Sequence, residues 1–472
     1  MSDDGAELQP SPLLADVRAA LPDLDVTEDE AWPPPTTLNE LAEGLLAARA
    51  DTRHARHRRR HERLLAAARA DAAAAARLDR LLRGLRYAND AGPVVLHPGG
   101  DGSPPTFSPS QLETYIQCPF RYFAGHALRL DAQRGPHPLR WDLGTLAHEL
   151  LATIVQAALR RGDVTSLSDE VWDELTAGAV AEYRRTQPPD LPERRPDFAF
   201  LGDVLLTRLR DVVRVHTARW RRGEFRPRGC EEWFGDGPRA TRPPIAVRLA
   251  DGRAVRIRGK IDRLDIATTQ NGPLLLIYDY KSGSVGPLRQ PFLTGARLQL
   301  FTYLLAWRGP PAAEGRMGGV LLAPLYPNLK ALEKAAGDGL PPEEQLMHAY
   351  KPRGLVTAEA AFLLDANLGG APSPVAQLRR RQDGELYANS DAVTPERLAA
   401  YAQLAEETVR QAAEQLLAGT ISIAPLVEKD RLACGTCDFR DVCRFDRAFN
   451  RPRAAEAALP QLADAADAED DE

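Results

Sequence analysis

The sequence contains no apolar run long enough to form a membrane-spanning helix. Its first residues, Met-Ser-Asp-Asp-Gly-Ala-Glu, have neither the basic start nor the apolar stretch of a secretory signal. Cysteine is scarce: the chain has five in 472 residues, an odd number gathered mostly near one end. Such a set argues against the disulfide framework of a secreted protein and favours metal ligation in a reducing compartment. We therefore expect a cytoplasmic protein.

Lysine is also rare, because only six of the sixty basic residues are lysines and the others are arginines. The formal net charge of −6 is mild, so any nucleic-acid binding must depend on local basic surface. The sequence contains no G-x-x-x-x-G-K-S/T loop of the kind that holds nucleotide phosphates. We therefore do not expect ATP-driven work by this chain.

A hydrophobic content of 44% over this length is typical of a globular chain with a sizeable core. We expect residues 1–104 to form a charged N-terminal helical region. Residues 105–450 would hold the main domain, with a helical insertion at about 162–227. Residues 451–472 form an acidic tail that we expect to be disordered.

Helix signals open and close the main domain. Ser108-Pro109-Ser110-Gln111 offers an N-cap, a proline in the first turn and a glutamine that completes a capping box. A second amphipathic helix is predicted over residues 142–161, with His148 among its leucines and alanines. A long helix is predicted over residues 395–417.

Between these helices the apolar period changes to two. Strands are predicted over residues 245–249, 255–266 and 274–281, in a three-stranded meander with short turns. A helix at about 296–307 and a strand at 319–325 follow. This order of helices and strands indicates an α/β domain with a mixed central sheet.

The third strand ends in charged residues. Side chains two apart on a strand share a face, so Asp279 and Lys281 emerge together at its end. Asp262 lies on the preceding strand, and antiparallel neighbours can bring the two carboxylates together. Such hard oxygen ligands suit Mg²⁺ or Mn²⁺, with Lys281 stabilising charge or orienting a water. The alternative is an edge-strand ion pair that faces solvent.

Two further sets of residues could line the same cleft. Gln299 and Tyr303 are four apart on the following helix and share a face, where they could bind a phosphate or stack on a base. The alternative is that both are ordinary polar residues on the outer face of an amphipathic helix. His148 could be a ligand or a satisfied core histidine.

Arginines near Asp262 are candidates for phosphate contacts. Arg256, Arg258 and Arg263 would grip the backbone of a nucleic acid, or would simply be solvated strand residues.

The cysteines form a second constellation. Cys434, Cys437 and Cys443 follow a C-x2-C-x5-C spacing, and Cys118 lies over three hundred residues earlier. Four thiolates can complete a tetrahedral zinc site or an iron-sulfur cluster. Cys230 is left over, and we expect a small buried residue there.

Together these residues resemble the RecB-type branch of the PD-(D/E)XK nucleases, and most of all the C-terminal iron-sulfur nuclease domain of AddB helicase-nuclease subunits. The matching pieces are Gly144–Glu149, Gly259–Arg263, Asp279–Gly283, and Gln299 with Tyr303. The resemblance implies an α/β fold with a restriction-endonuclease-like core, a mixed central sheet flanked by helices, helical insertions and an N-terminal helical region.

The resemblance also assigns roles. The metal ligands would be His148, Asp262, Asp279 and the backbone carbonyl of Tyr280, and Lys281 would be catalytic. Gln299 and Tyr303 would complete the catalytic set with these residues. A 4Fe-4S cluster, favoured over zinc, would be held by the cysteines of the second constellation, namely Cys118, Cys434, Cys437 and Cys443.

The function implied is that of a Mg²⁺- or Mn²⁺-dependent deoxyribonuclease, with exonucleolytic action favoured over endonucleolytic action. Its substrate would be single-stranded DNA or DNA ends in recombinational repair, cleaved alone or with a partner helicase subunit. Two alternatives stay open: a non-catalytic DNA-binding subunit of a helicase-nuclease complex, and a nuclease of the CRISPR-adaptation type.

Overall fold

The computed structural model describes residues 66, 69, 75–76, 92–96, 103–130, 140–186, 196–283, 285–286, 297–307, 315–428, 431–447 and 449–454. These residues fall into two compact units. The smaller unit contains residues 118–124 and 420–454, and the larger unit contains residues 95–117 and 125–419. The expected N-terminal helical region and acidic tail lie largely outside the described residues. Among the described helices, none has the length and apolar character needed to cross a membrane.

A seven-stranded sheet forms the centre of the larger unit, in the order β10-β9-β8-β7-β6-β2-β3. β7 pairs antiparallel with β6 and parallel with β8, so the sheet is mixed, and the expected α/β architecture is confirmed. Its strands are β2 (Arg226–Phe234), β3 (Ala240–Arg242), β6 (Gly259–Thr269), β7 (Gly272–Lys281), β8 (Arg316–Pro324), β9 (Arg353–Thr357) and β10 (Ala392–Val393).

The predicted meander is wrong in one respect. The single strand expected over residues 255–266 is two strands, and the first belongs to a separate sheet of β1 (Thr106–Phe107), β5 (Ala254–Ile257) and β4 (Ile245–Arg248). The chain changes partner at Arg258, whose backbone N–H bonds to the Phe107 carbonyl, whereas Gly259 pairs with Phe234 on β2. A Cβ at Gly259 would lie 2.5 Å from the Phe234 ring, so glycine permits this crossing.

The helix signals are reproduced closely. Ser108 and Gln111 form the reciprocal capping box at the start of α5: the Ser108 N–H donates to Gln111 Oε1 at 2.8 Å, and the Gln111 N–H donates to Ser108 Oγ at 3.2 Å. The helices of the larger unit are α5 (Pro109–Gln117), α7 (Arg140–Arg161), α8 (Asp169–Thr186), α9 (Pro196–Arg222), α11 (Gln299–Ala306), α12 (Leu329–Gly337), α13 (Pro342–Ala349), α14 (Ala358–Leu364) and α15 (Pro395–Leu417).

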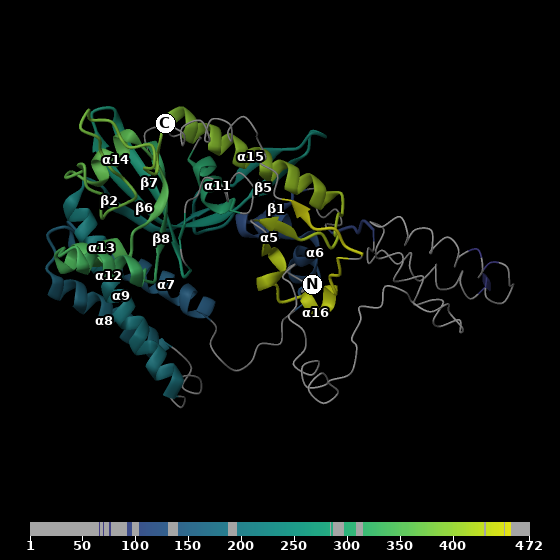
Figure 1. Ribbon diagram of the computed structural model, residues 1–472, viewed down its shortest axis with the longest axis horizontal. Helices are drawn as coiled ribbons and strands as arrows, with labels where there is room; N and C mark the ends of the chain where they lie inside the picture. Colours follow the sequence, from purple (N-terminus) through teal and green to yellow (C-terminus); the bar gives the residue numbers. More distant parts are fainter. Residues whose placement is uncertain are drawn as a thin grey trace, which may run out of the picture. The chain divides into compact units, whose positions relative to one another are not determined.

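Helices cover both faces of the sheet, which explains why β7 is apolar on both sides. Leu276 and Tyr278 point into the hydrophobic cluster with side chains of α7, α8 and α9, and Figure 1 shows these helices gathered with α12 and α13. Leu275 and Ile277, which alternate with them, point to the opposite face, where α11 packs on β7 and β8. The polar end of β7 therefore emerges between two helical layers.

The smaller unit contains short elements only. They are α6 (Pro119–Tyr122), the first two residues of the π-helical turn η1 (Phe123–Ala127), β11 (Leu426–Glu428), β12 (Arg431–Leu432), the 3-10 turn η3 (Ala433–Thr436), α16 (Arg440–Cys443) and β13 (Arg453–Ala454). β11 lies between β12 and β13 in a small sheet. The Phe120 N–H donates to the Ser422 carbonyl at 3.3 Å, which ties the early segment to the late one.

Candidate active site

Asp262 on β6 and Asp279 on β7 lie at the same end of two antiparallel neighbours. The register pairs Leu264 with Ile277 and Arg263 with Tyr278, so the next positions along are the two aspartates. Their exposed fractions are 7% and 2%. Two adjacent carboxylates are therefore buried at one strand end, where burial without a compensating cation is costly.

Lys281 links this strand end to α11. Its Nζ lies 2.5 Å from Asp279 Oδ2 and donates to Gln299 Oε1 at 3.1 Å. Gln299 Nε2 in turn donates to Tyr303 Oη at 2.6 Å, one helical turn further on. The structure thus joins the four residues Asp279, Lys281, Gln299 and Tyr303 in one chain of contacts.

Glu113 on α5 belongs to the same site, although the sequence reasoning missed it. Its Oε1 accepts hydrogen bonds from the backbone N–H groups of Leu298 and Gln299, both at 2.6 Å. α11 has no side-chain cap of its own, so Glu113 supplies the acceptor for its first turn. The signal was available, because no Ser, Thr, Asp or Asn precedes Gln299 in the segment Ala296-Arg297-Leu298.

His148 reaches the site from α7. Its Nδ1 lies 3.2 Å from Asp262 Oδ2, and its ring meets the Tyr280 ring edge-on at 5.6 Å. Gly144, one turn earlier, lets the helix come close to the end of β7, because a Cβ there would lie 3.1 Å from Ser282 Cβ. His148 therefore contacts a carboxylate and is not simply a core histidine.

The electrostatics follow from burial. The pKa of Asp279 is raised to about 6, because the effect of burial, together with the neighbouring Asp262 carboxylate, outweighs the lowering by Lys281. Burial would lower the pKa of Lys281, but the Asp279 carboxylate outweighs this and raises it. Burial likewise lowers the pKa of His148, but its contact with Asp262 raises it overall. The site therefore holds more buried acid than Lys281 alone neutralises.

The donors fit a hard divalent cation in kind. Two carboxylates, Asp262 and Asp279, lie together with the His148 imidazole. The backbone of Tyr280 adjoins this group, because its N–H donates to Asp262 Oδ2 at 2.7 Å. As the side chains stand, no three His, Cys, Asp or Glu groups in the described part of the chain converge as a metal site. Asp279 is turned to Lys281 and Asp262 to the Tyr280 amide, so cation binding requires these side chains to exchange partners.

One cavity of about 910 Å³ adjoins this site, and Glu113 lies behind its lining. Trp233 on β2 also lines it and is 39% exposed, which leaves an aromatic surface on which a base can stack. The predicted site residues that line the cavity are His148, Asp262, Asp279, Tyr280, Lys281, Gln299 and Tyr303.

The three arginines proposed for DNA contacts differ in position. Arg258 is exposed and lines the cavity, and Arg256 is half-buried and paired with Asp236. Arg263 is only 1% exposed, so the prediction that it contacts DNA is wrong. Strand alternation explains the error: Asp262 faces the cavity, and Arg263 must therefore face the helix-covered side.

Arg263 instead organises a buried polar network behind the site. It forms an ion pair with Asp265 at 2.8 Å and donates to Tyr280 Oη at 2.8 Å. Asp265 accepts from Trp220 Nε1 at 3.2 Å, and Tyr280 Oη lies 3.0 Å from His216 Nε2. The network fixes the Tyr280 ring, and hence the backbone between Asp279 and Lys281.

The cysteines of the smaller unit are free thiols. Burial, together with the charges of Cys118, Cys437 and Cys443, raises the pKa of Cys434 to about 11, so the four thiols lie within electrostatic reach of one another. Among the described residues they do not converge as a metal-holding group. Their chemistry nevertheless fits thiolate ligation, because the Cys118 sulfur accepts backbone N–H groups of Phe120, Arg121 and Ala424.

Cys230, the fifth cysteine, is 6% exposed on β2, as expected for a small buried residue. Burial raises the pKa of its thiol to about 12, which keeps it protonated and unreactive.

Comparison with known proteins places the chain in a family. The model of the PD-(D/E)XK nuclease superfamily matches residues 106–444. An ATP-dependent helicase/deoxyribonuclease subunit of Symbiobacterium thermophilum is 30% identical over 351 residues, 72% of this chain and 29% of that protein. Proteins of the same name from Moorella thermoacetica and Pelotomaculum thermopropionicum are 30% and 28% identical, over 78% and 94% of this chain and 32% and 40% of theirs.

The chain thus spans about a third of the length of the relatives it matches. The matched region runs from before Glu113 to beyond Cys443, and so includes the whole candidate site and the cysteine constellation. By this match over most of its length, the chain belongs to the PD-(D/E)XK nuclease superfamily.

Proposed function

We propose that this chain is a metal-dependent deoxyribonuclease that hydrolyses phosphodiester bonds at the cavity beside β7. The observation that carries the proposal is the placement of two buried carboxylates and a lysine, Asp262, Asp279 and Lys281, at one strand end. The superfamily match agrees with this chemistry.

Each residue has a defined task in such a reaction. His148, Asp262, Asp279 and the Tyr280 carbonyl would hold Mg²⁺ or Mn²⁺, which supplies Lewis acidity toward a phosphodiester oxygen and a water. The Lys281 ammonium, held by Gln299, stabilises the negative charge that develops on the phosphate. Tyr303 orients Gln299 by accepting a hydrogen bond from its side-chain amide, and Glu113 does so by accepting one from its backbone N–H.

The substrate we propose is single-stranded DNA or a DNA end, cleaved exonucleolytically during recombinational repair. The exposed ring of Trp233 can stack on an unpaired base, and Arg258 lies beside the cavity for a phosphate. The relatives are named as subunits of an ATP-dependent helicase/deoxyribonuclease, which supports a helicase partner that opens the duplex.

A 4Fe-4S cluster on Cys118, Cys434, Cys437 and Cys443 completes the proposal. The spacing of three local cysteines and one distant cysteine, together with the resemblance to iron-sulfur nuclease domains, favours the cluster over zinc. Iron and sulfide analysis of anaerobically purified protein tests this assignment, and stoichiometric zinc without iron would overturn it.

Cleavage of a labelled single strand with and without Mg²⁺ tests the enzymatic proposal. We expect Asp279→Ala to lose cleavage by at least about a hundredfold, the scale for removal of one key electrostatic group. Asp251→Ala is the matched control, because Asp251 lies in the exposed turn between β4 and β5. If the wild type cleaves no better than Asp279→Ala yet binds DNA, the chain is a non-catalytic DNA-binding subunit.

A further inference from the structure

The larger unit contains a second cavity, of about 1260 Å³, which adjoins the catalytic one. Ser282, the residue after the catalytic lysine, lines both cavities, and Gly283 and Val285 continue along the wall of the second. The opposite walls come from α12, α13, the start of β9 and the loop after α14. A chain that leaves the catalytic cavity past Ser282 therefore enters this space.

Lysines are concentrated in the second cavity. Lys330, Lys334 and Lys351 line it, which is three of the six lysines in the whole sequence. Lys330 and Lys334 are exposed and four apart on α12, so they present their ammonium groups on one face of that helix. In a chain whose basic residues are almost all arginines, this gathering is a specific feature of the cavity.

The acids of the lining are largely neutralised by other partners. Glu344 and Asp365 both bind Arg222, each at 2.8 Å, which leaves Asp338 as the remaining acid of the wall. Arg353 is likewise held by Asp391, with bonds of 2.8 and 2.9 Å. Both arginines of the lining and two of its three acids are therefore held in ion pairs. No carboxylate among the described residues forms an ion pair with any of the three lysines.

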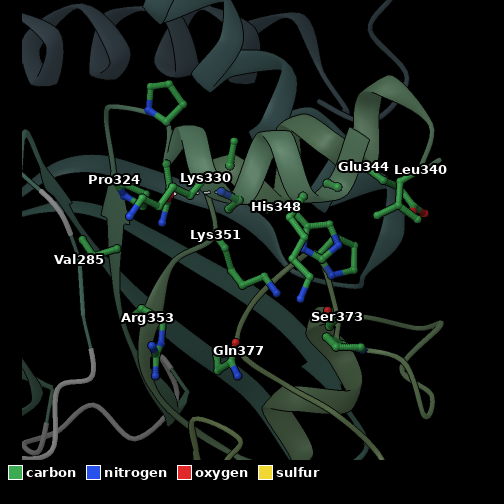
Figure 2. A pocket seen from close by; sticks show the side chains of 18 of the residues that line it. Val285, Pro324, Lys330, Leu340, Glu344, His348, Lys351, Arg353, Ser373 and Gln377 are labelled. Carbon is green, nitrogen blue, oxygen red and sulfur yellow. Dashed lines mark hydrogen bonds between the residues drawn. The ribbon is translucent and has the colours of Figure 1, made fainter. Parts of the chain in front are cut away.

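Lys351 is the most enclosed of the three. Figure 2 shows its side chain extending into the cavity, in the same space as His348, Arg353 and Gln377. It is half-buried, and no carboxylate in the described part of the chain lies within ion-pair distance of its ammonium. A half-buried ammonium without a carboxylate partner is costly unless an anion supplies the missing charge.

We propose that this cavity, the lysine cavity, binds the phosphates of a single DNA strand that passes Ser282 on its way to or from the catalytic cavity. The inference rests on the proposed nuclease function and names a subsite for it: Lys330, Lys334 and Lys351 contact successive phosphates.

Binding of a fluorescent oligonucleotide to protein carrying Asp279→Ala, in EDTA, tests the inference without any cleavage. We expect the added pair Lys330→Ala and Lys334→Ala to weaken binding about tenfold. The slope of log affinity against log salt should fall by about 0.7 for each lysine that loses a phosphate. Both lysines are exposed on α12, so the thermal unfolding of this variant should match that of its parent.

Arg316→Ala is the control, because Arg316 begins β8, pairs in register with Leu274 and lies at the opposite end of the sheet from Lys281. Inorganic phosphate should compete only weakly, which separates a strand site from a site for free phosphate. An unchanged affinity and salt slope, or an equal loss in Arg316→Ala, would overturn the proposal.

This binding result is independent of the cleavage test. If the wild type proves inactive but the lysines still govern binding, the nuclease function fails and the strand site stands. If the wild type cleaves but the lysines leave binding unchanged, the strand site fails alone.

Discussion

Single residues at the site act through direct contact with one another. Asp279 touches Lys281, Lys281 touches Gln299, and Gln299 touches Tyr303, so each side chain limits the positions of the next. A residue that fixes one end of this series can therefore control catalysis without contact with the substrate. Glu113 holds that position at the start of α11.

Glu113→Ala should lower kcat about tenfold with little change in KM, because it frees the first turn of α11 and the Gln299 that binds Lys281. It should also cost about 1 kcal/mol of stability, as the loss of a helix cap does. Glu113→Gln, which retains an acceptor oxygen, should restore most of the activity. Thr394→Ala is the control: Thr394 caps α15 by accepting from the Arg397 N–H, and its loss should affect stability but not cleavage.

Asp265→Asn should destabilise the protein by about 3–5 kcal/mol, because it leaves the buried Arg263 guanidinium without a counter-charge. Urea unfolding followed by circular dichroism measures the change. The exposed pair of Arg253 and Asp251 serves for comparison, and Asp251→Asn should leave the unfolding midpoint where it is. Equal midpoints for all three proteins would contradict the role given to the buried network.

At the scale of secondary structure, elements distant in the sequence set the properties of one side chain. Lys351 follows α13 and precedes β9, and burial lowers its pKa to about 8, to which neighbouring cations contribute. The charged and titratable groups that act on it come from five different segments. They are Arg219 on α9, Lys334 on α12, His348 on α13, Arg353 on β9, and Asp391 just before β10.

Strand binding should therefore weaken between pH 7 and about 9.5, because the Lys351 ammonium is present below pH 8 and lost above it. Lys351→Met should bind more weakly at pH 7 and lose this part of the pH dependence. Titration of oligonucleotide affinity against pH, in the Asp279→Ala background, measures both. The effect on stability has the opposite sign. The lysine of the unfolded chain keeps its proton to near pH 10.4, whereas that of the folded chain loses it near pH 8, so the free energy of unfolding increases as the pH rises through 8. A pH profile shared by both proteins would refute this role.

At the scale of the whole chain, the cysteines connect positions far apart in the sequence. Cys118 and the run from Cys434 to Cys443 lie in the smaller unit, where Cys118, Cys437 and Cys443 contribute to the raised pKa of Cys434. Ligands so distant in sequence restrict the unfolded chain strongly once they share a metal group.

Cys118→Ser should therefore lose most of the iron and acid-labile sulfide and lower the thermal unfolding temperature. Cys230→Ala should keep the full iron content, because Cys230 lies buried on β2 in the larger unit. Metal analysis of anaerobically purified variants decides the matter, and full iron in Cys118→Ser would exclude that residue as a ligand.

Much of the larger unit could be predicted because its signals are local. The capping box at Ser108, the helix over residues 395–417 and the buried strand ending at Lys281 depend on neighbouring residues only, and the structure reproduces them. Alternation along β7 likewise determined that Asp279 and Lys281 share a face.

Tertiary structure decided the rest, because it depends on which segments meet. The exchange of sheets at Arg258 follows from the contact of Gly259 with Phe234, and β2 lies almost entirely beyond the helical insertion expected at about 162–227, in a segment for which no strand was predicted. The cap from Glu113 to α11 and the lysine cavity join residues that are far apart in the sequence. The sequence by itself predicted the residues that the structure gathers around one cavity, whereas packing determined what holds them in place and which further surfaces adjoin that cavity.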